Sequence, residues 1–290
     1  MRKITYTIFA LLLVAMAVQH TSCTKCSTED RDSGRVQFDS VVFKQNVPLL
    51  AEFDSLKPYS EVDIVYKYPV RFKGSDQLEE LQKIFTGTFF GDVSIDDMTP
   101  QGALDLFTEG YVEEYQSLSN QYYDDMSRLE DDQIPMWYWY ALYMNNDIHF
   151  QNDHLISYSV TVYEYTGGAH GGTSLVNTTI DLENLYTLSE EDIFVPNFQH
   201  KLADIIIAQL MKEHNLTQRN ELIEIGFFNV DEIYPNNNFR LDEEGLFYTF
   251  NQYEIAPYVM GIIDVFIPYD ELLEILKVDS VITRFYKPEV

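Results

Sequence analysis

His170 is the residue whose surroundings most suggest chemistry, because it lies between glycines in residues 167–172 (GGAHGG). An imidazole on such a loop can contact a ligand or act as a general base. The chain has no G-x-S-x-G segment that would pair a serine nucleophile with it. A tight turn is the alternative, with Gly167, Gly168 and Gly171 at positive φ and the imidazole bonded to the backbone. His170 is therefore a candidate ligand-binding residue, and no catalytic residue is assigned.

A second group of candidates lies in residues 251–258 (NQYEIAPY), between two expected strands. Tyr253, Glu254 and Tyr258 offer aromatic and polar groups on a loop, where binding residues often occur. The same side chains could equally support the turn itself. We retain all three as candidate ligand-binding residues.

Metal and cofactor binding are not expected. His149 and His154 are five residues apart, with Asp147 and Asp153 nearby. Two histidines four apart on one helix face are more typical of a metal site, so a solvated loop is the better interpretation. The glycines of residues 167–172 precede an expected strand, whereas a phosphate-binding loop precedes a helix.

Hydrophobic periodicity indicates the elements that position these residues. Strands are expected over residues 36–43, 62–72, 136–144, 155–165, 173–182, 245–250 and 259–268, and helices over 77–85, 100–126, 197–214 and 269–276. The three strands between 136 and 182 should form an antiparallel meander. Because the strands and helices are clustered rather than alternating, we expect an α+β fold of antiparallel sheets packed with helices. Its two-part architecture would consist of an N-terminal α+β domain (36–150) and a C-terminal one (151–290).

The N-terminal residues resemble a bacterial export signal. Residues 1–22 have a basic start and an apolar run from Ile8 to Val18, which is too short to span a membrane. Cys23 follows Ser22 as in a lipobox, whereas Cys26 follows Lys25, where a small residue is required. We expect lipidation at Cys23, a flexible tether over 23–35, and a periplasmic or surface-facing location in the cell envelope. An ordinary cleaved signal with an incidental cysteine is the alternative.

The charge of the chain limits its partners. Its 47 acidic and 19 basic residues give a formal net charge of −28. Nucleic acid and anionic headgroups are poor partners for such a surface, whereas basic proteins would be attracted to it. The alternative is that the charge serves only solubility.

Two motifs carry a family resemblance: residues 163–171 (YEYTGGAHG), and residues 250–261 (FNQYEIAPYVMG) followed by 265–272 (VFIPYDEL). They resemble the C-terminal domain of RsiV-type anti-sigma factors, which is also found beside the catalytic domain of PdaC-type peptidoglycan deacetylases. The resemblance covers about residues 150–290, and residues 36–150 more weakly resemble the domain that usually precedes it. It implies an extracytoplasmic α+β domain that senses lysozyme by binding it. We expect no anti-sigma activity, because no sigma-binding segment is apparent.

The sequence thus predicts an envelope lipoprotein that acts as a protein- or glycan-binding module. A basic protein such as lysozyme, or cell-wall glycan, is the expected partner. The alternative is an envelope enzyme acting on peptidoglycan or another glycan.

Replacing Cys23 tests the anchor. We expect Cys23→Ala to release the protein from membranes almost completely, because stable attachment requires the acyl chains that a lipidated cysteine carries. Cys26→Ala is the matched control and should leave the protein membrane-bound. Fractionation followed by immunoblotting measures both, and a membrane-bound Cys23→Ala protein would refute lipidation.

Overall fold

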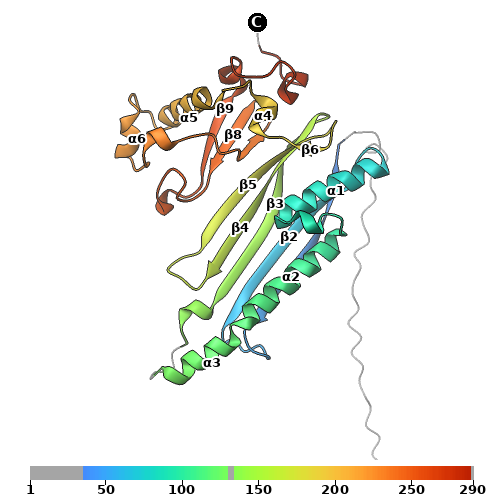
Figure 1. Cartoon of the computed structure of the whole chain (residues 1–290), viewed down its shortest axis with the longest axis vertical. Helices are drawn as coiled ribbons and strands as arrows, with labels where there is room; N and C mark the ends of the chain where they lie inside the picture. The colour runs from blue at the N-terminus through green and yellow to red at the C-terminus, as the bar shows by residue number, and fades with distance from the viewer. Residues whose placement is uncertain (1–34, 130–133, 289–290) are drawn as a thin grey trace, which may run out of the picture. The chain divides into compact units, whose positions relative to one another are not determined.

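The computed structural model describes residues 35–129 and 134–288, so the expected signal, Cys23 and most of the tether lie outside the described residues. A six-stranded sheet dominates the N-terminal two thirds (Figure 1). Its strands follow the chain order: β1 (Gln37–Pro48), β2 (Tyr59–Arg71), β3 (Tyr140–Gln151), β4 (Leu155–Thr166), β5 (Gly172–Asp181) and β6 (Tyr186–Thr187). Within the described residues, no helix combines the length and apolar character needed to span a membrane.

The α+β fold class is confirmed, and the pairing differs from the expectation at one place. All neighbouring strands of the sheet are antiparallel except β2 and β3, which run parallel from Ser60 opposite Tyr140 to Val65 opposite Asn145. A parallel pair requires a long crossover, and the helices between these strands provide it. The expected meander of β3, β4 and β5 is confirmed.

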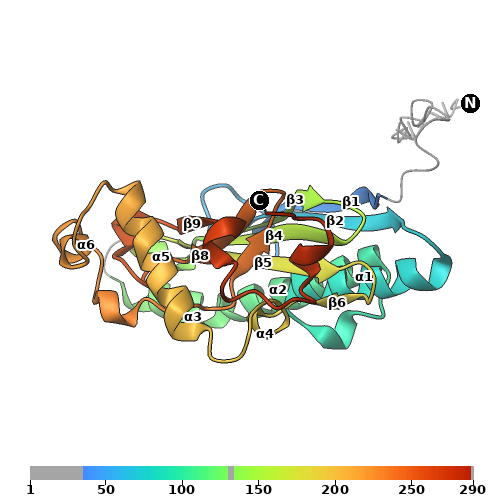
Figure 2. The same cartoon turned by 90° about the horizontal axis from the view of Figure 1, so that it is seen from above.

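The crossover contains three helices, α1 (Ser75–Phe90), α2 (Pro100–Ser117) and α3 (Ser119–Arg128). The side chain of Thr99 caps α2 and Pro100 occupies its first turn, as the sequence indicates. The single helix expected over 100–126 is interrupted at Leu118. In Figure 2, α1 and α2 lie along one face of the sheet. Their apolar side chains form a core there, in which Phe85 stacks on Tyr158 with ring centroids 4.3 Å apart.

The C-terminal part contains a second, antiparallel sheet with its own apolar core. Its strands are β7 (Phe239–Leu241), β8 (Gly245–Phe250) and β9 (Ile263–Pro268), and its helices are α4 (Glu190–Ile193), α5 (Gln199–Glu213) and α6 (Asn220–Glu224). Helix α5 packs against β9 (Figures 1 and 2). Short 3-10 helices occur at Val93–Ile95, Met136–Tyr138, Val230–Glu232, Tyr258–Met260, Tyr269–Leu272 and Val281–Arg284. The strand expected over 259–268 therefore begins only after the helix Tyr258–Met260.

Strand β4 contributes to both cores, because successive side chains of a strand point to opposite faces. Ile156 and Tyr158 belong to the core under α1 and α2, whereas Leu155 belongs to the C-terminal core. Ser157 accepts a hydrogen bond from the backbone N–H of Leu241 in β7. The described residues pack as one unit, and the six-stranded sheet contains strands from both sides of the expected division at residue 150.

A buried carboxylate links α4 to the second sheet. Glu190 accepts hydrogen bonds from the hydroxyl of Tyr248 (2.8 Å) and from the backbone N–H of Asn237 (2.6 Å). The Asn237 side chain accepts in return from the backbone N–H of Glu190. Burial raises the pKa of Glu190, although the two hydrogen bonds to its carboxylate oppose this shift.

The raised pKa of Glu190 has a testable consequence. A group with a higher pKa in the folded state favours folding at low pH, and this contribution is lost as pH rises from about 4 through the folded pKa. Glu190→Gln keeps an acceptor but cannot ionise, so we expect wild type to lose stability relative to Glu190→Gln as pH rises towards neutrality. Urea unfolding at several pH values measures this. Parallel pH profiles for the two proteins would contradict it.

Glu190→Ala provides the comparison for the hydrogen bonds. It leaves the buried Tyr248 hydroxyl without its acceptor, so we expect a loss of about 1–3 kcal/mol at every pH in the same unfolding experiment.

Candidate functional site

The strand ends of β4 and β5 frame a surface cleft of about 450 Å³, which we call the β4–β5 cleft. It brings together His170, Tyr253 and Tyr258, three of the four residues that the sequence predicts for ligand binding. The cleft is lined by Val162, Glu164, Thr166, His170, Gly171, Gly172, Thr173, Ser174, Asn251, Gln252, Tyr253 and Tyr258. Pockets of this size with aromatic walls and a few polar groups are typical of ligand sites.

His170 and Tyr258 form the aromatic part of the cleft. Their rings stack with centroids 4.0 Å apart and an angle of 26° between the planes. The Tyr258 hydroxyl donates to the carbonyl oxygen of Gly171 (2.9 Å), and Nδ1 of His170 lies 3.0 Å from the same oxygen. Because a carbonyl only accepts, this contact places the proton of a neutral imidazole on Nδ1 and leaves Nε2 available to a ligand. His170 makes no hydrogen bond to a serine, threonine or cysteine side chain within the described part of the chain.

Tyr253 extends the aromatic surface and has an unusual backbone. Its ring lies 5.8 Å from that of Tyr258, and 58% of the residue is exposed. Its φ is +69°, a left-handed conformation that is uncommon for a bulky residue. Such strain persists only where the surroundings enforce it, and it is concentrated at functional sites. The surrounding structure therefore holds the exposed ring of Tyr253 towards solvent.

The loop that carries Tyr253 is held against the edge of β5 by side-chain amides. The side chain of Gln252 accepts from the backbone N–H of Thr173 (3.0 Å). The Asn251 side chain accepts from the N–H of Leu175 (2.7 Å) and donates to its carbonyl oxygen (3.1 Å). These bonds replace those that a further strand would make, and they fix the loop beside the cleft.

Glu254 has a different position from the other three predicted residues. Its carboxylate accepts hydrogen bonds from the side chains of Asn236 (2.9 Å) and Asn251 (3.5 Å), and it is not among the residues that line the cleft. Through these hydrogen bonds Glu254 helps to position the loop that carries Tyr253. A direct contact between Glu254 and a ligand stays a prediction.

Glu164 lines the cleft and was not a sequence candidate. It lies on β4, with an exposed side chain, inside the motif of residues 163–171. The adjacent acid pairs of this chain are too frequent to single out one carboxylate. The one signal in the sequence that could have identified Glu164 is its position in the motif of residues 163–171, on the strand that leads into the glycine segment.

The glycines of the loop differ from one another. Gly167 has φ +79°, and a Cβ there would come within 2.1 Å of the Trp137 backbone. Gly168 and Gly171 do not have positive φ, so that part of the turn hypothesis is wrong. Gly171 is required for another reason: a Cβ would meet the Tyr163 ring at 2.5 Å.

The two histidines considered for metal binding, His149 and His154, contact different residues. Nε2 of His149, on β3, lies 2.7 Å from the hydroxyl of Ser159, and burial lowers the pKa of His149. His149 therefore belongs to a strand rather than to the expected loop. His154 faces Phe285. In the ranges that the structure describes, no group of three or more His, Cys, Asp or Glu side chains is placed to hold a metal ion.

The fold and the cleft define an α+β protein with two sheets and an aromatic surface site. Residues 191–270 match the family described as a protein of unknown function, DUF3298, and residues 58–173 match the family described as deacetylase PdaC. The crystal structure of a DUF3298 family member from Bacteroides fragilis is similar at 30% identity and a TM-score of 0.81, over 87% of this chain and 98% of that one. This chain belongs to the DUF3298 family.

A DUF3298 family protein from Pseudomonas aeruginosa shares the fold at 17% identity and a TM-score of 0.56, over 84% of this chain and 95% of that one. No curated protein matches the chain. The first motif, with His170, lies in the PdaC-matching segment, whereas Tyr253 and Tyr258 lie in the DUF3298 segment. The cleft is therefore built from both segments.

Alanine at the loop glycines tests this geometry. We expect Gly167→Ala to destabilise the protein by more than about 1 kcal/mol, because it combines a left-handed backbone with a steric clash. Gly168→Ala is the matched control, since its Cβ would meet nothing closer than 3.9 Å. Thermal melts of both variants measure the difference. Equal melting temperatures would contradict the described loop conformation.

Proposed function

We propose that this protein is a binding module of the bacterial cell envelope that recognises a basic protein, lysozyme in the first instance, through the β4–β5 cleft. The observation that carries the proposal is the convergence of His170, Tyr253 and Tyr258 from segments about 80 residues apart into one aromatic cleft. Buried aromatic anchors contribute much of the energy at protein interfaces.

Charge supports the choice of a basic partner. The chain has a formal net charge of −28, and the residues that line the cleft include Glu164 but no lysine or arginine. Opposite charge accelerates association, but it is screened beyond about 8–10 Å at physiological ionic strength. A specific complex therefore requires the aromatic contacts as well.

The resemblance to RsiV-type domains supports lysozyme in particular, since that family senses lysozyme by binding it. The expected lipid anchor at Cys23 would hold such a module in the envelope, where lysozyme acts. Membership of the DUF3298 family is compatible with this proposal and does not by itself assign a ligand.

A salt series with matched variants tests the proposed site. Tyr253→Asn removes the ring while keeping a residue that tolerates positive φ, so the loop should persist. Tyr123→Ala on α3 is the control, because Tyr123 is equally exposed, at 60% against 58% for Tyr253. We expect micromolar or tighter binding of lysozyme to wild type at about 0.15 M salt, about tenfold weaker binding to Tyr253→Asn, and no change for Tyr123→Ala.

Titration calorimetry measures these affinities, and three results would contradict the proposal. Absence of binding even at low salt would exclude lysozyme. Binding that disappears at physiological salt and is the same for wild type and Tyr253→Asn would be charge attraction without a dedicated site. Binding of cell-wall glycan fragments in place of lysozyme would refute the choice of a protein partner.

A further inference from the structure

A second hollow lies beside the cleft, between α2 and strands β3 and β4, and we call it the tyrosine cavity. Its volume is about 380 Å³. It is lined by Tyr111, Glu114, Tyr115, Ser117, Leu118, Tyr140, Glu164 and Thr166. Glu164 and Thr166 also line the β4–β5 cleft, so the two hollows are adjacent on one surface.

The aromatic walls of the tyrosine cavity are held in place by their own contacts. The Tyr115 hydroxyl donates to the carbonyl oxygen of Tyr138 (2.7 Å), and the Tyr111 hydroxyl is hydrogen-bonded to Ser60 (2.6 Å). The rings of Tyr115 and Tyr140 lie 5.0 Å apart at an angle of 44°. Because two of the three hydroxyl groups are already bonded, these residues offer mainly ring surface to a ligand.

Two carboxylates from different elements converge on these rings. Burial raises the pKa of Tyr111 and of Tyr140, and the negative charges of Glu114 on α2 and Glu164 on β4 raise both pKa values further. The two carboxylates therefore lie near both rings. Neither carboxylate forms an ion pair with a lysine or arginine of the described chain.

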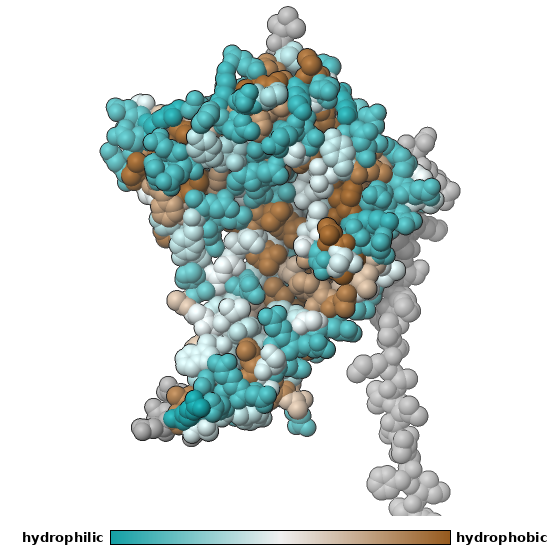
Figure 3. Space-filling model, in the orientation of Figure 1, coloured by the Kyte–Doolittle hydropathy of each residue, from teal (hydrophilic) through white to brown (hydrophobic). Residues whose placement is uncertain are grey.

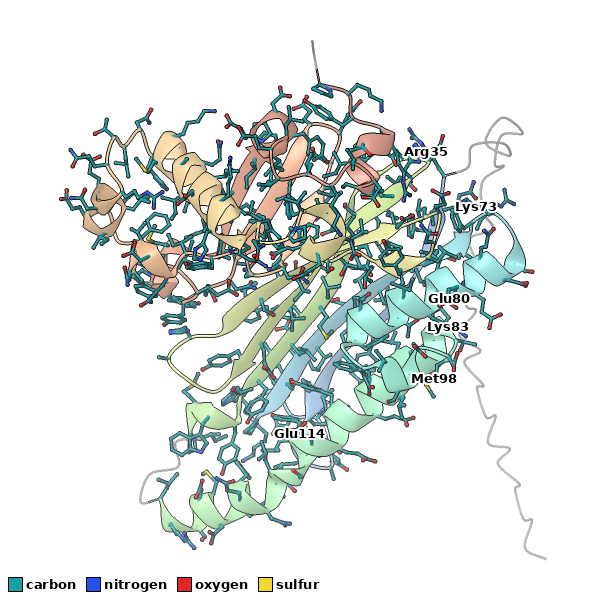
Figure 4. All side chains as sticks on the ribbon, turned by 45° about the horizontal axis from the view of Figure 1, so that its top comes forward. Arg35, Lys73, Glu80, Lys83, Met98 and Glu114 are labelled. Atoms are coloured by element: carbon teal, nitrogen blue, oxygen red, sulfur yellow. The ribbon has the colours of Figure 1, made fainter. Side chains whose placement is uncertain are left out.

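The residues that line the tyrosine cavity include no lysine or arginine. In Figure 4, Glu114 lies near the C-terminal end of α2, whereas the labelled Lys73 and Lys83 lie beside and on α1. Figure 3 shows apolar side chains gathered in the middle of this face, over the six-stranded sheet. A further hollow, whose lining includes Phe107, Val160 and Val176, also reaches Glu164.

From this arrangement we infer that the tyrosine cavity binds the guanidinium group of an arginine side chain presented by a basic partner protein. Aromatic faces attract cations, most strongly where the cation is desolvated. A guanidinium is planar, stacks on aromatic rings and has five donors, so it can serve both carboxylates at once, whereas a lysine ammonium is a strongly hydrated point charge. The inference rests on the proposed function, and it names the group that the partner inserts beside the cleft.

A small probe tests the cavity without a partner protein. The probe is Nα-acetylarginine methylamide, and the corresponding citrulline derivative is its neutral analogue. We expect the arginine probe to shift the NMR signals of residues lining the cavity, with at least tenfold weaker binding of the citrulline probe. Glu114→Gln should weaken the arginine probe about tenfold.

The matched control is Glu113→Gln. It lies next to Glu114 on the same helix and makes the same change in net charge, but Glu113 lines a different hollow on the other side of α2. It should leave probe binding unchanged. No binding of the arginine probe to wild type, or equal weakening by Glu113→Gln and Glu114→Gln, would overturn the inference.

Lysozyme binding by the same variants separates this inference from the proposed function. If both hold, Glu114→Gln weakens lysozyme about tenfold and Glu113→Gln does not. Lysozyme binding that is unaffected by Glu114→Gln would overturn the inference and leave the proposed function standing. Probe binding that depends on Glu114, without any lysozyme binding, would overturn the proposed partner and leave the arginine site standing.

Discussion

Strand β6 pairs only with the last residues of β5, and side-chain amides close the rest of this outer edge of β5. The site depends on this interaction. The side chains of Asn251 and Gln252 form hydrogen bonds with the backbone of β5 near the cleft. Farther along the strand, the side chain of Asn238 accepts a hydrogen bond from the backbone N–H of Asn177 (2.7 Å). An open edge exposes unpaired N–H and C=O groups that invite pairing with other chains. The amides satisfy these groups, and they also fasten the C-terminal loop to the first sheet.

This fastening explains why the cleft is composite. His170 belongs to the connection between β4 and β5, and Tyr258 begins the 3-10 helix between β8 and β9. The two rings nevertheless stack, because both segments are tied to the same strand end. The PdaC-matching segment and the DUF3298 segment thus each contribute one side of the cleft. The site would not exist in either segment alone.

The two proposed binding features fit one kind of partner. The β4–β5 cleft offers aromatic rings, the tyrosine cavity offers rings with two carboxylates, and Glu164 lies in the walls of both. A basic protein with an apolar contact surface and a protruding arginine matches both features. The overall acidity would then steer the encounter, while the rings supply contacts that salt does not screen.

Sequence periodicity by itself determined most strands and helices and the α+β class, because alternation and capping are local properties of the chain. Three residues of the cleft were predicted from their local sequence: His170 from its flanking glycines, and Tyr253 and Tyr258 from their place on a loop. It did not determine the parallel pairing of β2 with β3, the break at Leu118 or the role of Glu164. Those depend on which distant segments pack together. Tyr253 and Glu254 are adjacent in sequence but have different environments, and the tertiary structure likewise decided this difference. The left-handed backbone at Tyr253 turns its ring outwards, whereas Asn236 and Asn251 hold the neighbouring carboxylate of Glu254.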